Sequence, residues 1–246
     1  MTFVSGFPYN SDIFKRREYK MPNWVFNGLT VEGNPESVKK MRDQLNKPFT
    51  KMHEQWDIKT NEMKMERALY PNPVFAFHNI YSHLDAGITD EEYVKQPKRS
   101  ALEVKDPDWW SDTQKLASKD NSWYSFNNRE WGTKWDVAVS SDDKYPETNM
   151  EEAENGENYV VHYNFQTAWG IPLPAIEKLS AQYPDLLFTL SYEEETGWGG
   201  EMEFLRGVVI SQSEYETKCR ECDNTDCLIY DDEKGVEICQ KCGYES

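Results

Sequence analysis

Cysteine is absent from the first 218 residues of this 246-residue chain, and all five cysteines lie in the last 28. Long apolar runs are also absent, because no segment approaches the 18 consecutive apolar residues that indicate a membrane-spanning helix. Residues 1–19 contain no apolar stretch ahead of a small-residue cleavage site, so no secretory signal is expected. These absences argue against helical membrane spans and against a disulfide-rich secreted domain.

Basic residues are scarce. Lys and Arg number 27 against 44 Asp and Glu, which gives a formal net charge of −17 at pH 7. A chain this acidic repels phosphate through its mean field, so it is expected to be a poor general binder of nucleic acid. The sequence also lacks a GxSxG motif, a P-loop and a GxGxxG motif, and its glycines are scattered. No nucleotide cradle is therefore predicted.

Aromatic residues, in contrast, are plentiful. They make up 14% of the chain and include nine Trp, which is enough to build a hydrophobic core. The mean hydropathy of −0.85 indicates long polar loops around that core. The length fits one large domain, or one medium domain with an appendage.

Four of the cysteines form two CxxC pairs separated by sixteen residues. The pairs are Cys219 with Cys222 and Cys239 with Cys242. Zinc takes four thiolates in a tetrahedron, and each CxxC turn places two of them on one side of the metal. Gly243 suits a tight knuckle turn, and residues 228–230 and 236–238 are predicted to form two short strands. The pattern predicts a zinc ribbon that holds one structural Zn²⁺.

Two alternatives to this ligand set exist. The four cysteines could form disulfides, although the absence of a secretion signal and the regular spacing favour metal. Cys227 is left over, and it is either a free thiol or a replacement for Cys222 as a ligand. A segment of 28 residues buries too little apolar area to fold alone, so the metal should supply its stability.

Alternating apolar and polar residues predict strands in the rest of the chain. These strands are expected at 24–32, 159–165, 186–192 and 201–210, with a less distinct one at 135–139. Helices are predicted at 35–47, with the apolar stripe Val38, Met41 and Leu45, and at 172–183, with the stripe Ile176, Leu179 and Tyr183. Residues 197–200 read as the turn of a hairpin, and the acidic stretch 142–157 reads as a solvated loop.

This order of elements predicts an α+β fold. It is a ferredoxin-like split βαβ sandwich with one added edge strand and a long insertion at about 48–120, followed by the small zinc ribbon. Within the insertion, residues 49–70 are rich in Met, Lys, Glu and Gln and suggest a helix, while 74–80 suggest an extended segment. The predicted division is an N-terminal arm at 1–20, the ferredoxin-like domain at 21–212 and the ribbon at 213–246.

Three blocks of sequence resemble a family of phage and plasmid proteins, the Api92-like or YubB-like proteins. The blocks are residues 22–33 (PNWVFNGLTVEG), 128–136 (NREWGTKWD) and 163–172 (YNFQTAWGIP). The resemblance implies a ferredoxin-like fold and a mobile-element origin in a bacterial cytoplasm. It implies no established activity. A role in host takeover or anti-defence is a hypothesis that this origin and the net charge motivate together.

The second block suggests a candidate binding site. Its candidate residues are Trp131, Lys134, Trp135 and Asp136. With Trp24 and Trp169, the two Trp residues of this block either pack a core or form an aromatic platform, and packing is favoured. Lys134 and Asp136 are read as a structural pair, because no nucleophile or His accompanies them. His78 and His83 lack the glutamate of a zinc-protease helix, so a metal site there is not favoured.

The function predicted from these features is that of a non-enzymatic accessory protein. Its acidic surface, with Glu193, Glu194 and Glu195 as candidate contacts, would dock on a host protein that has a basic groove. The first alternative is a nucleic-acid-binding module that uses the sheet, the ribbon and a basic patch in the arm. The second alternative is a metal-dependent nuclease, in which Asp136 and Glu193 hold Mg²⁺. No membrane association is expected.

Overall fold

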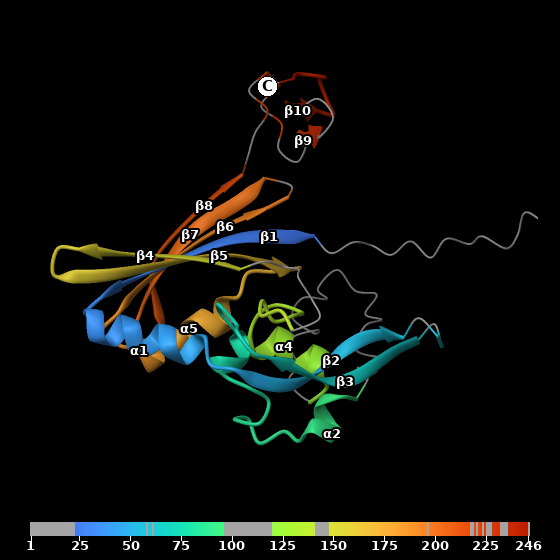
Figure 1. Cartoon of the computed structure of the whole chain (residues 1–246). Coiled ribbons are helices and arrows are strands. Elements are labelled where there is room, and N and C mark those ends of the chain that lie inside the picture. The colour runs from blue at the N-terminus through green and yellow to red at the C-terminus, as the bar shows by residue number, and fades with distance from the viewer. Residues whose placement is uncertain are drawn as a thin grey trace, which may run out of the picture.

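A computed structural model describes most of the chain (Figure 1). The described residues are 23–95 except 58 and 61, 120–140, 148–216 except 196, and 219, 221–222, 224, 228–231 and 236–245. The predicted arm at 1–20 and Cys227 lie outside the described residues. No helix in the described part of the chain is long and apolar enough to cross a membrane.

A six-stranded antiparallel sheet forms the centre of the molecule. Along the chain its elements are β1 (Trp24–Gly33), α1 (Pro35–Leu45), β4 (Asn149–Asn155), β5 (Asn158–Ala168), α5 (Leu173–Gln182), β6 (Leu187–Glu194), β7 (Trp198–Leu205) and β8 (Val208–Glu216). The strand order is β4-β5-β1-β6-β7-β8. The first four strands in this order give the split βαβ arrangement. With the insertion left out, α1 connects β1 to β4, and β5 lies between these two strands in the sheet. In the same way α5 connects β5 to β6, and β1 lies between them. The predicted ferredoxin-like α+β class is confirmed.

The sheet has one covered face and one open face. Helices α1 and α5 lie on the same side of it in Figure 1, and the predicted stripes of both helices are buried. Alternate residues of β1, β5 and β6 point into this core, as the sequence predicted. The residues between them face the opposite side, which neither helix covers. α1 begins where the Asn34 side chain accepts a hydrogen bond from the Glu36 backbone N–H, with Pro35 at the first helical position.

The prediction for the second strand of the fold was wrong. Residues 135–139 form no strand. The strand that pairs with β5 on the side away from β1 is β4, which lies within the stretch predicted as a solvated loop. All seven residues of β4 are exposed, so it shows no apolar alternation that would reveal a strand. The stretch between α1 and β4 therefore runs through residue 148, well past the predicted end of the insertion at about 120.

The end of the sheet also differs from the prediction. Residues 201–210 do not form a single strand, because a two-residue turn at Arg206 and Gly207, both with positive φ, separates β7 from β8. The fold thus gains two added strands instead of one. Gly199 and Gly200, expected in a turn, belong to β7. A side chain at Gly200 would lie 2.4 Å from the Ser213 carbonyl oxygen, so this strand needs glycine there.

The insertion contains its own hairpin. Strands β2 (Phe49–Asp57) and β3 (Glu62–Tyr70) pair in register where a helix was predicted. They are followed by the 3₁₀ turn η1 (Phe77–Asn79), where an extended segment was expected, and by the helices α2 (Asp90–Tyr93) and α4 (Trp123–Glu130). These elements lie on the helix side of the sheet (Figure 1).

Candidate functional site

The four cysteines of the predicted ribbon lie together. Their sulfur atoms are all within 4.8 Å of one another. The Cys219–Cys242 and Cys222–Cys239 sulfurs are 3.6 and 3.7 Å apart. In a tetrahedral thiolate site with metal–sulfur bonds of about 2.3 Å, neighbouring sulfurs lie about 3.8 Å apart. The arrangement can therefore hold one metal ion, and it is not a set of disulfides, because all four thiols are free.

Short strands and a glycine turn position these cysteines. β9 (Leu228–Asp231) and β10 (Val236–Cys239) pair as predicted, and β10 ends on a ligand. Gly243 has a φ of 74° and donates a backbone hydrogen bond to the Cys239 carbonyl oxygen, which forms the expected knuckle turn. The proposed exchange of Cys222 for Cys227 concerns a residue outside the described ones, but Cys222 itself stands in the cluster.

The Trp-rich block lies at the end of α4 and in the loop that follows. Trp131 is buried, and its indole N–H donates to the Tyr81 carbonyl oxygen at 2.8 Å. Trp24 and Trp135 contact each other with ring centroids 6.1 Å apart, and Trp135 is partly exposed. Trp169 is about half exposed. Of these four Trp residues, only Trp131 is fully in the core, and no common platform forms.

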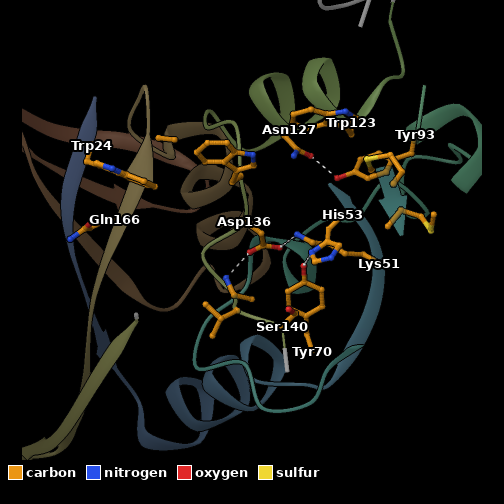
Figure 2. A pocket seen from close by; sticks show the side chains of 16 residues that line it. Trp24, Lys51, His53, Tyr70, Tyr93, Trp123, Asn127, Asp136, Ser140 and Gln166 are labelled. Carbon is orange, nitrogen blue, oxygen red and sulfur yellow. Dashed lines mark hydrogen bonds and ion pairs between the residues drawn. The ribbon is translucent and has the colours of Figure 1, made fainter. Parts of the chain in front are cut away.

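Asp136 is the most strongly held side chain of this block (Figure 2). Its carboxylate is 1% exposed and accepts a hydrogen bond from the Lys51 ammonium at 3.0 Å. It also accepts from the backbone N–H groups of Phe77, His78 and Ala138 at 2.9, 3.1 and 3.3 Å. The Asp136 carboxylate thus connects β2 and η1 to the loop that follows α4.

The predicted partner of Asp136 was wrong, although the predicted structural role fits this geometry. Lys134 places its ammonium 4.2 Å from the centre of the Trp135 ring instead. Asp136 forms its ion pair with Lys51. The Lys51 ammonium also lies over the rings of Tyr70 and Trp131, 5.2 Å from the centre of each. Lys51 could not be found from the sequence, since it stands 85 positions before Asp136 in a segment that was assigned to a helix.

Burial and neighbouring charges shift the pKa values of Lys51, Asp136 and His78. It lowers the pKa of Lys51, and the charge of Asp136 offsets this only in part. Burial alone would raise the pKa of Asp136, but the charges of Lys51 and His78, together with the hydrogen bonds, hold it below its ordinary value. Burial lowers the pKa of His78 to about 4. At neutral pH His78 is therefore uncharged beside an ionised Asp136.

A cavity of about 350 Å³ opens beside this ion pair, between the insertion and the edge of β1 and β5 (Figure 2). Its lining includes Trp24, Lys51, His53, Tyr70, Tyr93, Trp123, Asn127, Asp136, Ser140 and Gln166. Its polar groups largely engage one another. Tyr93 donates to Asn127 at 2.9 Å, and Asn127 donates to the Lys134 carbonyl oxygen at 2.8 Å. These contacts hold the insertion together around the cavity.

His78 and His83 have structural neighbours. The His78 ring stacks on Phe49 with centroids 4.2 Å apart. The His83 ring stacks on Tyr93 at 4.1 Å, and its Nε2 lies 2.9 Å from an Asp90 carboxylate oxygen. Among the described residues, the four-cysteine group is the only cluster that can hold a metal. Asp136 and Glu193 are therefore not brought together as Mg²⁺ ligands.

The open face of the sheet is an extended acidic surface. Its six strands contain ten Glu residues and no Lys or Arg. Strand register places five of the Glu residues on the open face, since they alternate with core residues. These are Glu32, Glu151, Glu193, Glu201 and Glu203. His162 also lies here, between the Thr30 hydroxyl at 2.8 Å and the Asn164 amide oxygen at 3.1 Å.

The three predicted acidic contacts separate at the end of β6. Glu193 points to the open face and accepts a hydrogen bond from the Tyr215 hydroxyl at 3.3 Å. Glu194 is half-buried and accepts from the Asn23 side chain at 3.0 Å. Glu195 is exposed just past the strand. The open-face acid of β4 was recognised only as part of the acidic stretch 142–157, because sequence alternation did not locate β4.

A comparison with protein-family models agrees with this fold over residues 134–232. No curated protein matches the chain. A solved structure that is similar is the protein Api92 from Yersinia pseudotuberculosis, with 10% sequence identity and a TM-score of 0.39. The match covers 81% of this chain and 100% of that one. Residues 134–232 match the family model described as the ferredoxin-like domain in Api92-like protein.

The matched residues contain the third sequence block and the end of the second, and the first block lies outside them. They begin at Lys134 and include β4 to β8, so they cover five strands of the central sheet together with α5. The resemblance recognised from the sequence is thus confirmed over residues 134–232, which match the ferredoxin-like domain of the Api92-like proteins.

Proposed function

We propose that this chain is a non-enzymatic binding protein whose open sheet face docks on a cationic surface of a protein partner. One observation carries the proposal: five of the ten Glu residues in the six strands lie on this face, and the six strands contain no Lys or Arg. Such a surface attracts a basic partner over a distance and orients it during encounter. The resemblance to a mobile-element family supports a host protein with a basic groove as that partner.

The charge pattern disfavours the nucleic-acid-binding alternative, and the distribution of possible metal ligands disfavours the nuclease alternative. A sheet that binds nucleic acid needs cations to meet the phosphates, and these six strands supply none. A nuclease needs clustered metal ligands, and the described residues cluster only the four cysteines. The basic residues of the predicted arm lie outside the described residues.

We further propose that the cysteine cluster holds one structural Zn²⁺. Four thiolates with sulfur separations close to those of a tetrahedral site match the preference of zinc. Because every ligand position is a cysteine, the ion stabilises the ribbon and leaves no coordination position for a substrate.

Affinity capture with matched charge variants tests the docking surface. The face variant changes Glu151, Glu193, Glu201 and Glu203 to Gln. The control variant changes Glu36, Glu62, Glu66 and Glu91, which are all exposed and lie off this face, so both variants have the same net charge. A host protein retained after nuclease treatment by the wild type and the control, and lost by the face variant, supports the proposal. Equal retention by both variants would show that this face is not the binding surface.

A further inference from the structure

The open face has a hollow of about 480 Å³ over β5, β1, β6 and β8. The outward side chains that line it are Phe26, Asn149, His162, Asn164, Gln166, Ser191, Glu193 and Tyr215, together with Gly28. Glu193 is the single carboxylate in this lining, and the lining contains no Lys or Arg. Acceptor groups and two aromatic rings thus surround a space that has a negative charge at one side.

Strand register fixes one row of this hollow. Phe26 pairs with Glu193 across β1 and β6, Glu193 pairs with Gly199, and Gly199 pairs with Tyr215. Because Gly199 has no side chain, the Tyr215 ring lies over it, where an added Cβ would be 2.6 Å from the hydroxyl. The Tyr215 hydroxyl therefore reaches the Glu193 carboxylate from one side, while Phe26 lies on the strand at the other side.

The next row forms the floor. Gly28 pairs with Asn164 on one side and Ser191 on the other, and an added Cβ would lie 2.7 Å from the Ser191 hydroxyl and 3.3 Å from the His162 ring. The Ser191 and His162 side chains therefore lie close over the Gly28 backbone, where a larger residue would not fit. Phe26 remains 48% exposed and Tyr215 49% exposed, although both are large side chains. An apolar ring this exposed beside a carboxylate can receive a group that is both flat and cationic.

We infer that this hollow binds an arginine side chain of the partner, an inference that rests on the proposed docking function. The guanidinium plane would lie against the Phe26 ring and donate hydrogen bonds to the Glu193 carboxylate. One oxygen of that carboxylate accepts the Tyr215 hydroxyl, and the other accepts no hydrogen bond from the described residues. The Ser191 hydroxyl and the Asn149 side-chain oxygen offer further acceptors for the remaining N–H groups of the guanidinium.

Arginine fits this site better than lysine for physical reasons. Its guanidinium is planar, weakly hydrated and rich in fixed donors, so it stacks on a ring and meets a carboxylate at the same time. A lysine ammonium is a compact and strongly hydrated charge, and it gains less from an exposed ring. Simple attraction to an acidic surface would not distinguish the two residues.

The test compares two short peptides of equal length and charge, one alternating Gly with Arg and the other alternating Gly with Lys. Titration calorimetry on the full chain measures both affinities. We expect the Arg peptide to bind about three- to fivefold more tightly to the wild type. Phe26→Leu, which keeps an apolar side chain, and Glu193→Gln should each reduce that ratio to about one. Glu203→Gln, the same charge change on the same face outside the hollow, should preserve the ratio.

The outcomes separate this inference from the proposed function. Equal affinities of the two peptides for the wild type, both weakened by the four-residue face variant, would overturn the arginine site and leave the acidic docking face standing. Binding of neither peptide would overturn the arginine site, while the capture experiment would still decide the docking function by itself. Tyr215→Phe keeps the ring and frees the carboxylate, so it should retain the preference for Arg.

Discussion

Removing the acid of the buried Lys51–Asp136 pair should strongly destabilise the insertion. Asp136→Asn leaves the Lys51 ammonium without a counterion in a site where that side chain is only 7% exposed. The new amide also turns donors toward Lys51 and toward the His78 N–H, which both need an acceptor. Breaking one partner of a buried pair typically costs about 3–5 kcal/mol.

For Asp136→Asn, the contacts that remain place the expected loss of unfolding free energy at the lower end of that range, about 3 kcal/mol. The Asn oxygen can still accept from Phe77 and Ala138, as one Asp136 oxygen does now. The pKa of Lys51 is already lowered by burial, so it can lose its proton when the acid is gone, which limits the penalty. Lys51→Met should cost less, about 2 kcal/mol, because the carboxylate keeps its three backbone donors. The double variant should be more stable than the sum of the two single changes predicts, by about 1–2 kcal/mol.

Urea unfolding followed by Trp fluorescence measures these differences, and hydrogen exchange shows whether the β2–β3 amides lose protection first. Lys64→Met is the matched control, since Lys64 pairs with Asp57 in the same hairpin at a solvent-exposed position. That control should leave the unfolding midpoint nearly unchanged. A cost below about 1 kcal/mol for Asp136→Asn would refute the argument that a buried and fully engaged pair fastens the insertion.

Three further predictions concern the site and the fold. Because the pKa of His78 is lowered to about 4, His78 is protonated in the unfolded chain but not in the folded chain between pH 6.5 and 4. Stability should therefore fall by about 3 kcal/mol as pH drops through that window, and His78→Phe should show a smaller loss in the same urea titrations. Metal analysis should find one zinc per chain, and Cys239→Ser or a strong chelator should expose the ribbon to proteolysis while the circular dichroism of the sheet persists. Gly132→Ala should lower the free energy of unfolding by about 2 kcal/mol in denaturant titrations. Gly132 has a φ of 82°, and an added Cβ would lie 2.6 Å from the Ile171 carbonyl oxygen. An unchanged unfolding midpoint would contradict this prediction.

Sequence patterns located the elements whose burial alternates. β1, β5 and β6 each bury every second residue, and α1 and α5 each bury one stripe, so hydrophobic periodicity was sufficient. β4 has no buried residue, and its three Glu made it indistinguishable from a loop. Residues 49–70 contain good helix formers, yet their register as a hairpin is set by contacts made later in the chain.

Those contacts show why much of the candidate site could not be predicted. Phe49 stacks on His78 with centroids 4.2 Å apart, and Lys51 reaches Asp136 across 85 positions of sequence. Neither contact leaves a local signature. The cysteine cluster was predictable because two short turns and one metal preference determine it. The arginine hollow depends on the register of four strands, which follows only when the whole sheet order is known.

The two edges of the sheet are chemically unequal. β4 has Glu151, Glu152 and Glu154 along its length, a charge pattern that natural sheets use to discourage further strands. β8 has no charged residue from 208 to 213, and Val208 and Ile210 are 57% and 53% exposed there. Within the described residues, nothing pairs with the outer side of β8. Growth of the sheet by strand addition, from a neighbouring copy or from an extended peptide, is therefore directed to β8 and resisted at β4.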